Sequence, residues 1–71
     1  MNKFTIERHL VGHSVKISAE YVERLELYCL TIRADGRLWD VRQSDDVLKD
    51  AGEILGEVFD ELMEEMPAAQ A

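Results

Sequence analysis

A chain of 71 residues is long enough for one domain but too short for two, which argues against a substrate cleft between two lobes. Its apolar fraction of 46% is that of a globular protein, so the net charge of −7 does not imply a disordered acidic chain. The single cysteine excludes an internal disulfide, no stretch has the roughly 18 apolar residues of a membrane span, and the N-terminus lacks the apolar core of a signal peptide. We therefore expect one domain, residues 1–71, in the cytoplasm.

The first predicted elements are two strands joined by a tight turn. Apolar and polar residues alternate over about 3–11, which is the period of a half-buried strand. Gly12 suits the first central position of a type II′ turn, because glycine accepts a positive φ, and this turn would place Leu10 opposite Val15. A second strand then covers about 14–18. The apolar residues expected on one face are Phe4, Ile6, Leu10, Val15 and Ile17.

A connection is predicted over 18–24, either as a loop or as a short helical turn capped by Ser18. The next two strands, about 24–34 and 37–43, flank Asp35-Gly36, the dipeptide typical of a type I′ hairpin. Pairing outwards from this turn sets Arg33 against Leu38, Ile32 against Trp39, Thr31 against Asp40, Leu30 against Val41 and Cys29 against Arg42. The buried face would hold Tyr28, Leu30, Ile32, Trp39 and Val41.

A helix is predicted over about 45–66. Ser44 would be its N-cap, Pro67 would end it, and 67–71 would be a frayed tail. Its apolar half on a helical wheel consists of Val47, Leu48, Ala51, Ile54, Leu55, Val58, Phe59, Leu62 and Met66.

The predicted fold is α+β: an antiparallel β-meander of about four strands with one C-terminal amphipathic helix packed on one face. Leu25, Leu27 and Leu38 are apolar exceptions on the face that the helix leaves open. Clustered with Cys29, they would form an apolar patch through which two copies of the chain form a homodimer. The alternative is that a curled sheet, or the connection over 18–24, covers these leucines within one chain.

Catalysis finds little support in the sequence. His9 and His13 lie on a strand and in a turn, where a four-residue spacing does not bring two imidazoles together, so each is expected to be solvated. Cys29 has no predicted histidine neighbour, its nearest predicted charge is Arg42, and it is interpreted as a small structural residue. No nucleotide, calcium or nucleophile motif occurs, and no metal or cofactor is predicted. We expect a non-enzymatic protein.

Gly52 and Gly56 lie one turn apart inside the predicted helix, where glycine lowers helix stability. Two interpretations remain open. Either the helix packs closely on the sheet at these positions, under Trp39, or the glycines form a groove for a second helix or a partner.

The charge is distributed unevenly along the chain. Residues 1–44 carry seven basic and six acidic side chains, whereas residues 45–71 carry one basic residue, Lys49, and nine acidic ones. On a helical wheel the carboxylates form a stripe opposite the apolar half, about 27 Å long at 1.5 Å per residue. Its members are Asp46, Asp50, Glu53, Glu57, Asp60, Glu61 and Glu64. The stripe is either a contact surface for a basic partner or a face that serves only solubility.

A very short acidic α+β chain with an acidic helix and no catalytic motif resembles the small phage-encoded anti-CRISPR inhibitors, several of which mimic nucleic acid. The resemblance is one of overall type and carries over no individual residue. It implies an inhibitor that occupies a Lys/Arg-lined guide-RNA or target-DNA groove of a CRISPR effector, in the cytoplasm of the host cell. Such a protein would bind a basic protein surface rather than nucleic acid or a membrane. The alternative is a homodimeric accessory or assembly protein.

Overall fold

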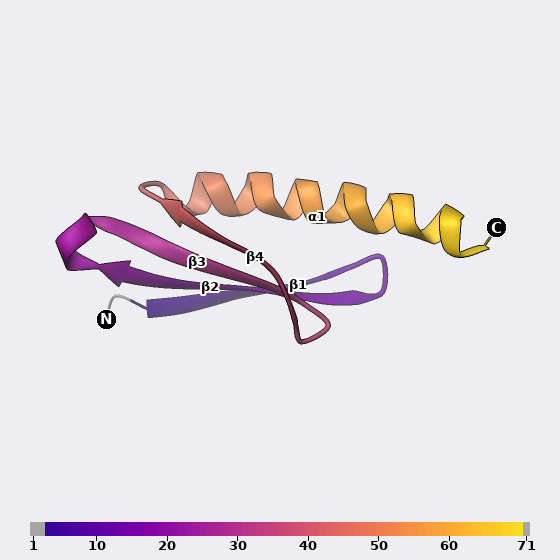
Figure 1. Cartoon of the computed structure of the whole chain (residues 1–71), viewed down its shortest axis with the longest axis horizontal. Helices are drawn as coiled ribbons and strands as arrows, with labels where there is room; N and C mark the ends of the chain where they lie inside the picture. The colour runs from indigo at the N-terminus through magenta and orange to yellow at the C-terminus, as the bar shows by residue number, and fades with distance from the viewer. Residues whose placement is uncertain (1–2, 71) are drawn as a thin grey trace.

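The structure is a computed structural model that describes the backbone of residues 3–70 and the side chains of residues 3–64 (Figure 1). Four strands, a short 3₁₀ helix and one α-helix follow each other along the chain. In order they are β1 (Lys3–Leu10), β2 (His13–Val22), η1 (Glu23–Leu25), β3 (Leu27–Ala34), β4 (Arg37–Ser44) and α1 (Val47–Gln70).

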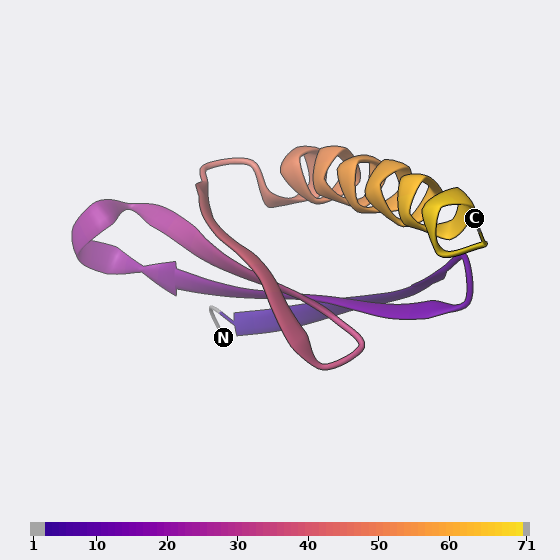
Figure 2. The same ribbon diagram turned by 45° about the vertical axis from the view of Figure 1, so that its right-hand side comes forward.

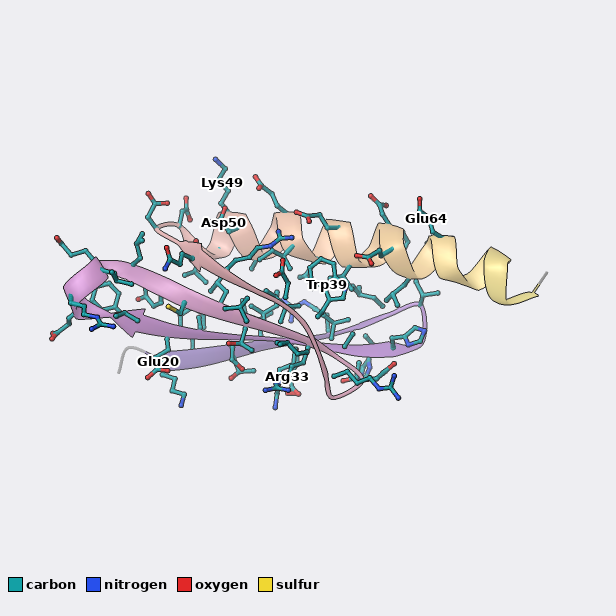
Figure 3. All side chains as sticks on the ribbon, viewed as in Figure 1. Glu20, Arg33, Trp39, Lys49, Asp50 and Glu64 are labelled. Carbon is teal, nitrogen blue, oxygen red and sulfur yellow. The ribbon has the colours of Figure 1, made fainter. Side chains whose placement is uncertain are left out.

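The predicted α+β fold is confirmed. The four strands form one antiparallel sheet in the order β1-β2-β3-β4, and α1 lies across one face of it (Figures 1 and 2). In Figure 1 the last turns of α1 extend past the β1–β2 turn. The other face of the sheet carries no layer from the described part of the chain; Glu20 and Arg33 project from it in Figure 3.

The hydrophobic core lies between α1 and the two central strands. Ile17 on β2, together with Leu30 and Ile32 on β3, meets Ile54 and Val58 on α1, and all five side chains are at most 2% exposed. The other buried apolar residues are Val15, Ala19, Val47, Ala51 and Leu62. Alternation along the strands and the 3.6-residue period of the helix supply these two apolar faces.

The first hairpin has a different turn from the one predicted. Val11 and Gly12 are its two central residues, both at positive φ (51° and 80°), as in a type I′ turn. Leu10 therefore pairs with His13 rather than Val15. The register moves by two residues, so each side chain keeps its predicted face. The prediction failed because valine, a β-branched residue, seldom adopts a positive φ.

The predicted connection over 18–24 is wrong, because β2 continues to Val22. Ala19 pairs with Leu30 and Tyr21 with Tyr28, and these side chains extend the apolar face of β2. The chain reverses only at η1, which ends at Glu26 in a left-handed conformation (φ 54°).

The second hairpin contains a β-bulge that the sequence analysis did not predict. Arg33 pairs with Leu38 as expected, but Ile32 pairs with Asp40, which leaves Trp39 as an extra residue. Beyond the bulge every residue of β4 lies on the face opposite to its predicted one. The predicted pairs of Ile32 with Trp39, Thr31 with Asp40, Leu30 with Val41 and Cys29 with Arg42 are therefore incorrect.

Both predicted ends of the helix need correction. The N-cap is Asp46, whose Oδ1 accepts a hydrogen bond from the backbone N–H of Lys49 at 3.3 Å. Ser44 is instead the last residue of β4; it is buried, and its Oγ accepts the N–H of Asp46 at 3.1 Å. At the other end α1 continues to Gln70, past Pro67, whose fixed φ is compatible with a helix.

The apolar half of α1 is narrower than predicted. Leu48 is 78% exposed and Phe59 43%, so these two predicted residues lie outside the core, whereas Leu55 packs at its border. Gly52 and Gly56 are also exposed, and a Cβ added at either would meet nothing within 4 Å. The interpretation that they pack under Trp39 on the sheet is therefore wrong. The predicted core residue Met66 lies outside the described side chains.

Candidate interaction surface

Acidic side chains of α1 line the flank of the helix that borders β4. Two of them contact that strand: Glu57 binds Arg42, and Asp50 accepts a hydrogen bond from Ser44 Oγ. Asp46, at the start of the flank, caps the helix. These three of the seven predicted contact residues therefore have partners within the chain.

Arg42 joins the helix to the sheet. Its guanidinium donates to both carboxylate oxygens of Glu57, at 2.8 and 2.9 Å, and its Nε donates to Asp40 at 2.7 Å. The group also lies 5.4 Å from the centre of the Trp39 ring, within the range of a cation–π contact. The bulge places Arg42 on this face, and for that reason the sequence analysis missed the ion pair.

The contacts with Arg42 hold the carboxylates of Glu57 and Asp40 in the charged form. Hydrogen bonds from Arg42 lower the pKa of Glu57 below its ordinary value of 4.5. Hydrogen bonds from Arg42 and from the N–H of Val41 lower the pKa of Asp40 below 3.8. The two carboxylates in turn raise the pKa of Arg42. Glu57 is therefore part of an internal ion pair.

Glu53, Asp60, Glu61 and Glu64 are the other members of the predicted stripe. All four are exposed, and none makes a hydrogen bond or ion pair with another residue of the described segment. Figure 3 shows Glu64 pointing away from the sheet. We call these four residues the acidic face. They span about 17 Å of helix at 1.5 Å per residue.

A hollow of about 470 Å³ lies between the acidic face and the end of the β3–β4 hairpin. Glu61 borders it on the helix side, and Arg37, Leu38 and Trp39 border it on β4. Its lining mixes charged and apolar groups, so it offers a partner both a charged edge and an aromatic ring. Neither the hollow nor a role of Arg37 in lining it was predicted from the sequence.

The leucines of the predicted dimer patch are not brought together. Leu27 pairs with Val22 at one end of β3, whereas Leu38 pairs with Arg33 near the other end, about 20 Å away at 3.3 Å per residue. Leu25 lies in η1, close in sequence to Leu27 but far from Leu38. The structure thus separates the three leucines into two small groups, one with Leu25 and Leu27 and one with Leu38.

His13 is not simply solvated as predicted. Its Nδ1 lies 2.5 Å from Asp35 Oδ2, and Asp35 Oδ1 accepts the backbone N–H of Ser14 at 3.0 Å. These contacts join the two hairpin turns, and they lower the pKa of Asp35. His9 is exposed on β1.

Cys29 pairs across the sheet with Gln43 and Glu20. Its predicted neighbour Arg42 lies on the other face of the sheet and pairs with Leu30. Within the described residues no three His, Cys, Asp or Glu side chains are arranged to hold a metal ion.

The Arg42 cluster predicts an acid-dependent loss of stability. Because the folded-state pKa values of Glu57 and Asp40 are depressed, their contribution is present above the unfolded values of about 4 and is lost as the pH falls through the folded values. The Arg42→Gln variant should therefore show a smaller fall of its thermal midpoint between about pH 6 and pH 3 than the wild type. The difference should be no more than a few degrees, because solvent screens these exposed carboxylates.

Thermal unfolding followed by circular dichroism across this pH range measures the effect. Arg33→Gln is the matched control, because Arg33 is exposed on the open face of the sheet. Superimposable pH profiles for the two variants would contradict the assignment of the acid response to the Arg42 cluster.

Among the described residues no helix is long and apolar enough to cross a bilayer. No protein-family model, curated protein sequence or solved structure matches the chain.

Proposed function

We propose that the chain is a small non-enzymatic inhibitor that acts in the cytoplasm and docks its acidic face onto a basic, nucleic-acid-binding surface of a protein partner. The observation that carries this proposal is that Glu53, Asp60, Glu61 and Glu64 are exposed and have no hydrogen-bond or ion-pair partner among the side chains of residues 3–64. Lys49 is the only basic residue in α1, and it lies at the opposite end from Glu64. A face designed for helix stability alone would interleave lysines with the carboxylates.

The spacing of the charges suits a surface that binds phosphates. Four carboxylates over about 17 Å give about one charge per 4–5 Å, compared with one per 3.4 Å along each strand of duplex DNA. A row of lysines and arginines that tracks a phosphate backbone can therefore engage the row of carboxylates on one rigid helix. Glu57, Asp50 and Asp46 contribute to the negative field, although their own hydrogen bonds are made within the chain.

A CRISPR effector complex, with its Lys/Arg-lined groove for guide RNA or target DNA, is the partner class that we propose to test first. Docking in that groove would exclude nucleic acid by occupying its site and by charge repulsion. We expect the chain to displace labelled target DNA from a purified effector. Displacement should weaken steeply between about 50 and 200 mM salt, because association depends on charge.

Charge reversal tests the contact surface directly. In a Glu53→Lys, Asp60→Lys, Glu64→Lys variant we expect a loss of affinity of about 10- to 100-fold and a flatter salt dependence. The matched control is Glu7→Lys, Glu20→Lys, Glu23→Lys, which makes the same change in net charge at exposed positions of the sheet and η1. An equal loss in both variants would mean that net charge alone matters. No loss in either would mean that the acidic face serves only solubility.

A further inference from the structure

The flank of α1 away from β4 carries large apolar side chains that no part of the described chain covers. Leu48, Phe59 and Met63 are 78%, 43% and 46% exposed, and Leu55 is half-buried beside them. At 100° per residue these four share one stripe of the helix with Gly52 and Gly56. We call this the apolar stripe; it is separate from both the core face and the acidic face.

The glycines in the stripe have no explanation within a single chain. Glycine inside a helix lowers the stability of the helix relative to alanine. Two glycines there are therefore most readily explained if other atoms approach the helix closely at these positions. A Cβ at Gly52 or Gly56 would meet nothing within 4 Å, so the described chain makes no such approach. Two flat positions bordered by leucine, phenylalanine and methionine suit a second helix that lies against this stripe.

We propose that the occupant is a second copy of the chain, packed through the apolar stripe as an antiparallel helix pair about a two-fold axis between Leu55 and Gly56. This register places Phe59 opposite Gly52 of the second copy, and Leu55 opposite its Gly56. Leu48 faces Met63 of the second copy in the same way. Because the contacts are isologous, each occurs twice, and each large side chain meets a glycine or the flexible methionine.

The charges also favour an antiparallel pair. Lys49 borders the apolar stripe, and in this register it lies within one helical turn of Asp60 of the second copy, so two ion pairs form across the seam. A parallel pair in register would place Phe59 beside Phe59 and would put Lys49 and Asp60 of the second copy on opposite flanks of the seam. It would also align the two helix dipoles, which repel each other when parallel.

The exposed area indicates a weak dimer. Leu48, Phe59 and Met63 together expose about 300 Å² of apolar side-chain surface per copy, against about 800 Å² of total surface per partner in a standard interface. Backbone at the glycines and the stems of bordering charged residues add to it. We therefore expect dissociation in the micromolar range.

Dimerisation leaves Glu53 and Glu64 of the acidic face free. On the helical wheel these two residues centre about 120° from the middle of the apolar stripe, so they point away from the second copy. The proposal is independent of the identity of the basic partner. A dimer would present two acidic faces to that partner, one on each side of the two-fold axis.

Sedimentation equilibrium from low micromolar to submillimolar concentration tests the seam. We expect a dimer for the wild type and at least tenfold weaker association for Phe59→Glu, which places two negative charges in the seam, one from each copy. Leu38→Glu on the open sheet face is the control and should associate like the wild type. A wild type that remains monomeric throughout, or a dimer dissociated by Leu38→Glu and not by Phe59→Glu, would overturn the proposal.

The Gly52→Ala variant should have opposite effects on the stability of the monomer and on the affinity of the dimer. Alanine should raise the thermal midpoint at concentrations where the chain is monomeric, because the site is open and helical. The same methyl group should weaken the dimer severalfold by lifting Phe59 of the second copy off the helix. Tighter association in this variant would contradict the predicted contact.

Cross-linking tests the register. In a Cys29→Ser background, Gly56→Cys places the two cysteines about 1.5 Å apart along the helix axes, whereas Gly52→Cys places them about 10 Å apart. Only the first is within disulfide reach, so mild oxidation should give covalent dimers of Gly56→Cys alone. Equal cross-linking of both variants would indicate a parallel pair and refute the antiparallel one.

Discussion

Ile32→Lys should unfold the protein, whereas Val41→Lys should leave its stability within about 0.5 kcal/mol of the wild type. Both residues are β-branched and lie in the same hairpin. Ile32 is fully buried, and a lysine there would leave a charge without a partner in the core, which costs several kcal/mol. Val41 is 57% exposed on the open face of the sheet, where a lysine remains hydrated.

Urea unfolding followed by circular dichroism compares the two variants. A chain of this length has a total stability of roughly 4–10 kcal/mol, so the Ile32 variant should have little or no folded baseline. A Val41→Lys variant that also fails to fold would contradict the bulge at Trp39, because Val41 faces the core only in a strand without that bulge.

The same pair of residues shows where sequence patterns reach their limit in this fold. Alternation identifies the buried face of β2 and β3 correctly, since Val15, Ile17, Leu30 and Ile32 all lie in the core. In β4, however, strict alternation assigns Val41 to the core. Nothing in the local pattern indicates that Trp39 is an extra residue without a partner of its own on β3. A one-residue bulge reverses every later side chain.

The position of the bulge also decides which carboxylates are free. A helical wheel predicts seven equivalent acidic residues, but it contains no information about the strand beneath the helix. Because Arg42 is turned toward α1, it binds Glu57; because Ser44 is turned the same way, it binds Asp50. Three of the seven predicted carboxylates therefore have partners within the chain, and the other four remain a predicted contact surface.

The wheel likewise overestimates the core. Nine apolar positions fit one half of the helical wheel, yet the sheet covers only a narrower band of the helix. Its buried residues are Val47, Ala51, Ile54, Val58 and Leu62. Leu48 and Phe59 fall outside that zone. The apolar stripe and the acidic face thus arise from one geometric fact: a helix on a small sheet has two flanks that the sheet does not reach.

Truncation to alanine should affect two aliphatic residues of that helix very differently: we expect Ile54→Ala to lower the stability of the monomer strongly and Leu48→Ala to leave it almost unchanged. Ile54 is 2% exposed and packs in the core, so truncation should cost about 2–5 kcal/mol, a large part of the total stability. Leu48 is 78% exposed, and alanine is the best helix former, so its truncation should change the stability of the monomer by less than about 0.5 kcal/mol.

Urea unfolding at a concentration well below the expected micromolar dissociation constant measures both free energies in the monomer, so the result does not depend on self-association. A loss above about 1.5 kcal/mol for Leu48→Ala would show that this side chain packs on the sheet, because only buried leucine is expected to lose that much on truncation to alanine. Repeating the measurement at submillimolar concentration then adds the contribution of the dimer. There Leu48→Ala should become destabilising relative to the wild type, since the lost side chain faces Met63 of the second copy and binding stabilises the folded state by mass action.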